Sequence, residues 1–165
     1  MAREFALDST ILVILGGGHS DEARALERAE GILSEHEDAG EVVGVPAPAW
    51  AECCHCDFDT SFVIWPLNPK AAVIANRLPP AMIQAGKAKG CTRRAAKMDA
   101  LILATAEAEG CKAIYTTDGW FEEVAKTAGL TIQVRPLPPV RPVQVQIPEV
   151  QHVDIDAQES KKTKT

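Results

Sequence analysis

Short apolar runs alternate with helical segments along most of this 165-residue chain, and this alternation constrains the fold more than any other feature. The runs expected to form strands are residues 5–7, 41–45, 61–67, 112–117 and 130–137. The segments expected to form helices are residues 20–40, a stretch starting near Pro48, and residues 68–78, 99–110 and 119–129. Strands that alternate with helices predict an α/β domain with a parallel sheet. A chain of this length can bury one such core.

Local signals place several helix boundaries. Asn68 is an expected N-cap with Pro69 in the first turn. Ser20 is a second plausible N-cap, with Leu26, Ala29 and Leu33 then falling on one helical face. The run "STILVIL", residues 9–15, either continues the first strand or begins a helix.

The charge is unevenly distributed. Residues 1–60 carry 3 Lys/Arg and 13 Asp/Glu, whereas residues 61–135 carry 10 and 6. The net charge of −6 therefore hides a basic middle section, and it does not exclude a nucleic-acid partner.

Four acids stand near the ends of expected elements. Asp8 and Asp118 each follow a strand, Glu52 lies beyond the strand at 41–45, and Asp99 begins the helix that leads to Asp118. Ligands of parallel α/β sheets bind outside the carboxyl ends of the strands, so all four could converge there. Converging carboxylates repel one another unless cations neutralise them, and Mg²⁺ or Mn²⁺ prefers such oxygen ligands. Taken singly, each acid has another explanation: a turn residue, a helix cap for Asp99, or an exposed surface residue for Glu52.

The sequence around these acids resembles PIN domains, most of all the toxin ribonucleases of VapBC-type toxin–antitoxin pairs. The matching stretches are "ALDSTIL", "APAWAEC", "KMDALILATAEAEGCKAIYTTDGWF" and "AGLTIQV". The third is the most specific, and together they span about residues 4–137. The resemblance implies a three-layer α/β/α nuclease domain over residues 1–137. The proline-rich tail at residues 138–165 lies outside the matching pattern.

The resemblance also implies a function, which is Mg²⁺- or Mn²⁺-dependent cleavage of RNA by a cytoplasmic toxin that forms a homodimer and has a possible antitoxin partner. Asp8, Asp99 and Asp118 would hold the metal directly or through water. Glu52 would be a further ligand, or would orient and deprotonate the attacking water. Thr117 would hydrogen-bond a ligand carboxylate or a water beside the metal. The alternatives are a PIN-like module that binds RNA or protein without cutting, and a structure-selective DNA nuclease, for which the chain is short.

A basic run precedes Asp99. Lys89, Arg93, Arg94 and Lys97, with Lys87 before them, form either a solvated surface or a strip that contacts RNA phosphates.

Three other motifs have simpler explanations. The run Cys53-Cys54-His55-Cys56 has one C-x₂-C spacing and no second pair, which favours buried or incidental cysteines over zinc or redox chemistry. The run Gly16–Gly18 lacks a phosphate-loop pattern and is expected to be a connection. Trp120 and Phe121 are expected in the core, with base stacking as the alternative.

The ends of the sequence add two expectations. Residues 136–165 hold five prolines and few large apolar side chains, so a disordered or draped tail is expected, with "VQVQI" as a possible added strand. The apolar run at residues 11–15 is too short for a signal-peptide core, and no run reaches the length of a membrane span.

Five cysteines without a regular framework favour a reducing cytoplasm.

Overall fold

The computed structural model describes residues 3–18, 20–53, 62–78 and 92–140 of the chain. Within these residues, five strands form one parallel sheet in the order β3-β2-β1-β4-β5. The strands are β1 (Arg3–Leu7), β2 (Val42–Pro46), β3 (Val63–Trp65), β4 (Ala113–Tyr115) and β5 (Gln133–Arg135). The predicted α/β fold with a central parallel sheet is therefore confirmed.

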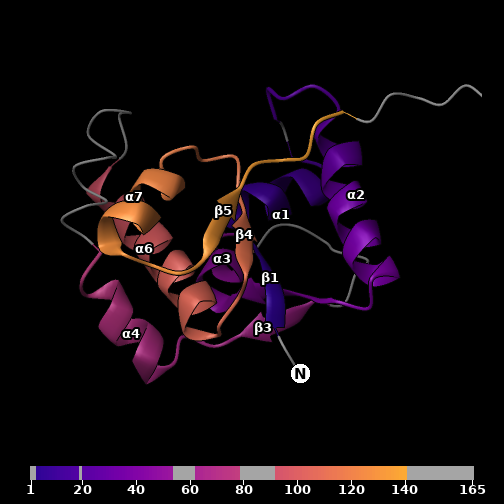
Figure 1. Cartoon of the computed structure of the whole chain (residues 1–165). Coiled ribbons are helices and arrows are strands. Elements are labelled where there is room, and N and C mark those ends of the chain that lie inside the picture. Colours follow the sequence, from indigo (N-terminus) through magenta and orange to yellow (C-terminus); the bar gives the residue numbers. More distant parts are fainter. Residues whose placement is uncertain (1–2, 19, 54–61, 79–91, 141–165) are drawn as a thin grey trace, which may run out of the picture.

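Helices cover both faces of this sheet. They are α1 (Ser9–Leu15), α2 (Ala25–Asp38), α3 (Ala47–Glu52), α4 (Pro69–Ala75), α6 (Arg93–Ala108) and α7 (Phe121–Ala128). Figure 1 shows α2 on one side of the strands and α4, α6 and α7 on the other. This is the expected three-layer α/β/α arrangement of a PIN-like fold.

The central strands are buried because both of their faces are covered by helices. Leu7 of β1, Val45 of β2 and Ile114 of β4 have no exposed surface. Such strands form from continuous apolar runs rather than from alternating ones, as in other parallel sheets. At the edge of the sheet, Val63 and Ile64 of β3 are 48% and 39% exposed.

One glycine is required by the packing of β2 against β3. A Cβ atom built on Gly44 would lie 2.2 Å from Cζ2 of the fully buried Trp65. The indole ring therefore lies directly on the backbone of β2, where no side chain fits.

The helix boundaries confirm some predictions and correct others. Asn68 caps α4, since its side chain accepts a hydrogen bond from the Ala71 amide at 2.9 Å. Residues 9–15 form a helix rather than a continuation of the strand. The prediction that Ser20 caps α2 is wrong, because that helix begins at Ala25 and the Ser20 hydroxyl instead accepts a hydrogen bond from the Glu22 amide in a turn.

The core-facing residues of α2 also differ from the prediction. Ala29 and Leu33 pack toward the core as expected, but Leu26 is 44% exposed. The buried side chains of this helix are Ala25, Ala29, Ile32 and His36. The side of α2 that packs on the core is therefore the one that carries Ala25, Ala29, Ile32 and His36, and Leu26 lies outside it.

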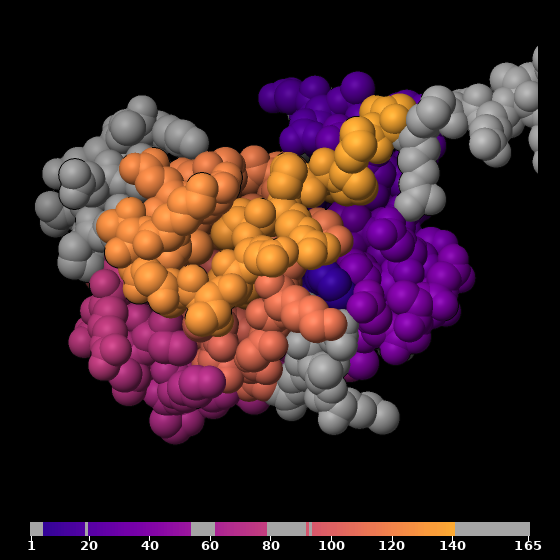
Figure 2. All heavy atoms as spheres, in the orientation of Figure 1, coloured from indigo at the N-terminus to yellow at the C-terminus, as the bar shows by residue number. Residues whose placement is uncertain are grey.

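The segment after β5 is held against α2. Arg28 of α2 donates hydrogen bonds to the carbonyl oxygens of Leu137, at 3.1 Å, and Pro138. Figure 2 shows this yellow segment lying against the purple residues of α2. The chain thus remains attached to the domain through residue 138, and the predicted boundary at 137/138 stays a prediction because most of the tail lies outside the described residues.

Candidate functional site

The strand order brings two of the predicted acids to one point. The chain continues from β1 to β2 and β3 on one side of the sheet, and it places β4 and β5 on the other. The carboxyl ends of β1 and β4 therefore meet where the strand order reverses, which is the usual ligand position in open α/β sheets. Asp8 follows β1 directly, and Asp118 follows β4 by three residues.

Asp8 is a buried carboxylate held by hydroxyl groups. It is 1% exposed, and its Oδ2 accepts hydrogen bonds from Thr116 Oγ1 at 2.7 Å and Thr10 Oγ1 at 2.9 Å. Burial raises the pKa of Asp8, and the hydrogen bonds from Thr116 and Thr10 oppose that rise. The hydroxyls thus favour the ionised form of Asp8 and offset part of the effect of burial.

The hydroxyl that contacts Asp8 is that of Thr116, directly after β4, whereas the resemblance assigned to Thr117 a contact with a ligand carboxylate or with a water beside the metal. Thr116 also accepts a hydrogen bond from the Asp118 amide at 3.0 Å, so it joins both acids. Thr117 instead donates its backbone amide to Thr10 Oγ1 at 3.1 Å. The predicted contact of Thr117 with a water beside the metal stays a prediction.

Thr10 was missed by the sequence-based prediction. A signal was present, because two hydroxyl residues follow Asp8 in "DST" at the start of a helix. The position of Thr10 in the first turn of α1 places its side chain beside the carboxylate that precedes the helix.

Asp99 does not begin its helix. The side chain of Thr92 caps α6 by accepting a hydrogen bond from the Ala95 amide at 3.2 Å, and Asp99 lies well inside the helix that follows. The capping explanation for Asp99 is therefore wrong. Its carboxylate is only 7% exposed, on a helix whose other buried residues face the core.

The pKa of Asp99 is raised by burial and by neighbouring negative charges. Burial, followed by the negative charges of Asp8, Asp118 and Glu52, raises this pKa from 3.8 to about 8. The effect of one charge on another weakens with distance, so the three carboxylates that act on Asp99 lie in the same region of the fold as Asp99.

Glu52 completes this group from the end of α3. Partial burial is the main cause that raises its pKa, and the charge of Asp8 acts in the same direction, whereas a hydrogen bond with Ser9 opposes them. Its side chain is more exposed to solvent than those of Asp8 and Asp99. Of the four acids, Glu52 is thus the one best able to exchange protons with water.

The oxygen atoms of these four carboxylates suit a hard divalent cation, although their present arrangement does not form a metal site. Four carboxylates with hydroxyls behind them are the oxygen ligands that Mg²⁺ and Mn²⁺ prefer. Within the described ranges, no group of three or more His, Cys, Asp and Glu side chains is arranged to hold a metal ion. The acids are near enough to repel one another, and a cation would have to draw them closer.

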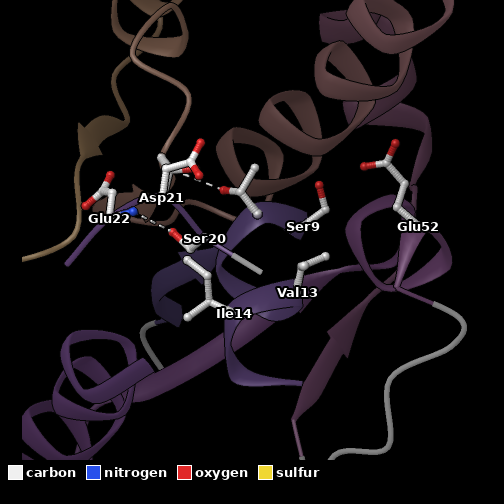
Figure 3. Close-up of a pocket in the computed structure, with 9 residues that line it drawn as sticks. Ser9, Val13, Ile14, Ser20, Asp21, Glu22 and Glu52 are labelled. Atoms are coloured by element: carbon white, nitrogen blue, oxygen red, sulfur yellow. Dashed lines mark hydrogen bonds between the residues drawn. The ribbon is translucent and has the colours of Figure 1, made fainter. Parts of the chain in front are cut away.

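A hollow of about 520 Å³ adjoins the acids. Figure 3 shows Glu52 and Ser9 on one side of it, Asp21 and Glu22 on the other, and Val13 and Ile14 between them. Thr10 and Thr117 also line it, so a molecule in this hollow would lie beside the Asp8 cluster.

The basic run is only partly described. Arg94 and Lys97 are exposed on α6, whereas Lys89 and the side chain of Arg93 lie outside the described part of the chain. At about 100° per residue, Arg94 and Lys97 share one face of the helix, and Asp99 points to nearly the opposite face. These two cations therefore do not lie beside the acids, and their contact with RNA stays a prediction.

Two other predicted features are placed by the structure. Trp120 and Phe121 are buried in the core, with ring centroids 5.3 Å apart, as predicted. Cys53 is buried and its thiol contacts the Ser9 carbonyl oxygen, and the rest of the run 53–56 lies outside the described residues.

The fold is similar to a solved structure. A chain in the crystal structure of VapBC2 from Rickettsia felis bound to a DNA fragment from their promoter superposes with a TM-score of 0.54. The alignment has 14% sequence identity and covers 81% of this chain and 98% of that chain. At this identity the likeness shows the fold alone. No protein-family model and no curated protein matches the sequence. Among the described residues, no helix is both long and apolar enough to cross a membrane.

Proposed function

We propose that this protein is a metal-dependent endoribonuclease, and that it is the toxin of a toxin–antitoxin pair. The observation that carries the proposal is the burial of Asp8 and Asp99 beside further acids: burial first, and then the negative charges of Asp8, Asp118 and Glu52, raise the pKa of Asp99. Several negative charges near one buried position destabilise the fold, and a bound cation would neutralise them. Such groups of carboxylates are therefore candidates for functional sites. A divalent cation is the ligand that this chemistry suits best.

Each acid has a distinct part in the proposal. Asp8, Asp99 and Asp118 hold the cation, and Thr116 and Thr10 keep the Asp8 carboxylate oriented through their hydrogen bonds. Glu52, the more exposed acid, is placed to accept the proton of the attacking water or to serve as a further ligand. When bound, Mg²⁺ or Mn²⁺ supplies Lewis-acid stabilisation of the charge that develops on the phosphate.

The fold neighbour supports the biological context. VapBC2 is a complex bound to promoter DNA, so a small protein partner that binds DNA is proposed for this chain too. A homodimer in the cytoplasm is part of the same proposal.

A second candidate is a PIN-like module that binds RNA or protein without cutting it. The absence of three acids arranged to hold a metal, within the described residues, is the observation that favours it. The two candidates differ in one measurable property, which is catalysis in the presence of a divalent cation.

The deciding experiment compares wild-type protein with Asp99→Asn in an RNA-cleavage assay with Mn²⁺. Asparagine keeps the shape of the side chain but removes its charge and weakens it as a ligand. We expect wild type to cut RNA and Asp99→Asn to be inactive, and Asp8→Asn added to Asp99→Asn to change little further, because residues that act as a unit are not additive. Equal cutting by wild type and Asp99→Asn would assign the activity to a contaminant or to another site.

A further inference from the structure

The hollow beside the acids has a second wall that the proposed chemistry does not use. Asp21 and Glu22, in the turn before α2, lie across from Glu52 (Figure 3). Val13, which is 36% exposed, and Ile14 form an apolar surface between the two walls. The hollow thus combines an apolar surface with groups that accept hydrogen bonds.

Glu22 is held in a fixed position on this wall. Arg28 forms a salt bridge of 2.8 Å with its Oε2, and Arg28 is itself bound to the carbonyl oxygens of Leu137 and Pro138. The Glu22 amide also donates to Ser20 Oγ at 3.2 Å. The Glu22 side chain nevertheless remains 38% exposed. A carboxylate that is both anchored and accessible is organised in advance to accept hydrogen bonds from a ligand.

The hollow also continues beyond Glu22. A neighbouring hollow of about 400 Å³ shares Ile14, Ser20 and Glu22 with the first and extends to Gly17, Gly18 and Leu26. Glu22 therefore lines both hollows.

The charge of the lining decides which part of an RNA chain fits. The described lining of the first hollow holds three carboxylates and no Lys or Arg, so it disfavours a phosphate. A nucleobase is neutral and has an apolar face that can lie on Val13 and Ile14. An ionised carboxylate only accepts hydrogen bonds. Guanine alone of the four RNA bases presents two adjacent donors, N1–H and the N2 amino group, on its Watson–Crick edge. On adenine, cytosine and uracil an acceptor stands beside every donor of that edge.

We infer that this hollow is a base-recognition subsite in which Glu22 selects a guanine next to the cleaved phosphodiester bond. The inference rests on the proposed ribonuclease function and adds the substrate preference of the same site. Arg28 is the positioning residue that orients Glu22, and Val13 and Ile14 supply the apolar surface under the base.

The first experiment reads base preference directly. Wild-type protein with Mn²⁺ cuts a random-sequence RNA pool, and sequencing of the product ends should show guanosine enriched at one position beside the cut. Two matched RNAs are then made with guanosine or inosine at that position, since inosine lacks only the 2-amino group. We expect kcat/KM to be about tenfold or more higher for guanosine, as for loss of one hydrogen bond to a charged acceptor.

The Glu22→Gln variant tests the residue itself. The guanosine-to-inosine ratio should fall toward one in Glu22→Gln and stay at the wild-type value in Glu30→Gln, a matched change at an exposed glutamate of α2. A second arm measures binding of the same two RNAs in Ca²⁺, where no cleavage is needed. If Glu22→Gln melts well below wild type, the comparison of guanosine with inosine on wild-type protein still tests the subsite. Equal kcat/KM for the two RNAs would refute recognition of the 2-amino group.

The possible failures are distinguishable. No cleavage by wild type with any divalent cation refutes the proposed function, whereas cleavage without a base preference refutes only the subsite. A ratio unchanged in Glu22→Gln also overturns the inference. If Glu22→Gln instead speeds cutting of all RNAs equally, Glu22 merely repels phosphate. If a tri-arginine peptide binds wild type and not Glu22→Gln while the ratio is unchanged, the hollow takes a basic protein side chain.

Discussion

Thr116 Oγ1 donates a hydrogen bond of 2.7 Å to Oδ2 of Asp8, joining the ends of the neighbouring strands β4 and β1. The same hydroxyl accepts the amide of Asp118 at 3.0 Å. One side chain thus fixes the relative position of two acids that are far apart in sequence.

Thr116→Val should weaken the metal site while leaving the fold in place. Valine keeps the shape but removes the donor that favours ionised Asp8, so the pKa of Asp8 should rise further. We expect Mn²⁺ affinity to fall about 10- to 100-fold, as for other residues that orient ligands. Thr116→Ser should retain most of the affinity. Thr105→Val removes a buried hydroxyl that donates to the Leu101 carbonyl oxygen of α6 at 2.7 Å, and it should leave Mn²⁺ affinity unchanged.

Without added metal, stability should decrease as the pH rises. Asp99 has a pKa of about 8 in the folded protein and an ordinary value of 3.8, so the folded state binds more protons than the unfolded state between these values. The free energy of unfolding therefore falls with pH across this window, by at most about 1.4 kcal/mol per pH unit from this group, and no further above it. Asp99→Asn should flatten this dependence in urea titrations from pH 4 to 9, leaving the contributions of Asp8 and Glu52, whose pKa values are also raised. Identical slopes of the free energy of unfolding against pH in wild type and Asp99→Asn would contradict the raised pKa of Asp99.

Added Mn²⁺ should stabilise the wild-type protein. A ligand that binds only the folded state at 100 times its Kd contributes about 2.7 kcal/mol, which corresponds to a Tm increase of roughly 5 °C or more in a chain of this size. Asp8→Asn should lose most of this increase in a thermal-shift measurement. A Tm indifferent to millimolar Mn²⁺ in the wild type would argue against a shared metal site.

Gly44→Ala should destabilise the sheet. The new methyl group would lie 2.2 Å from the ring of the buried Trp65, so strand or indole must move. Overpacking of this kind costs about 1–3 kcal/mol. Gly31→Ala in α2 is the control, because nothing lies within 4 Å of its Cβ position. That change should be neutral or stabilising by up to about 1 kcal/mol. Equal denaturation midpoints for the two variants would refute the close packing of Trp65 on β2.

Arg94→Ala with Lys97→Ala should reduce the salt dependence of RNA binding. Both side chains are exposed on one face of α6, and each contact with a single-stranded phosphate contributes about 0.7 to the slope of log K against log salt. We expect the slope to decrease in magnitude by up to about 1.4 while the Mn²⁺-dependent Tm increase persists. An unchanged slope would show that these residues are a solvated surface.

Much of the fold was predictable because its signals are local. The apolar runs of β1 and β4, the Asn68 cap of α4 and the stop at Gly129 after α7 depend on residues close in sequence. The start of α2 was mispredicted because Ser20 and the acids after it have the residue types of a helix N-terminus, whereas they form a turn. The helix begins after Arg24, which makes no side-chain cap hydrogen bond and so gives no local signal.

The sequence by itself determined that acids follow strands: the placing of Asp8 and Asp118 after β1 and β4 depends only on where each apolar run ends. The tertiary structure decided that β1 and β4 are neighbours, that Thr116 contacts Asp8, and that Asp99 faces the other acids from within α6. It also decided that Glu22 lies across a hollow from Glu52. These relations join segments far apart in the chain, so they follow from the order of strands in the sheet and the burial of shared surfaces, which no local pattern encodes.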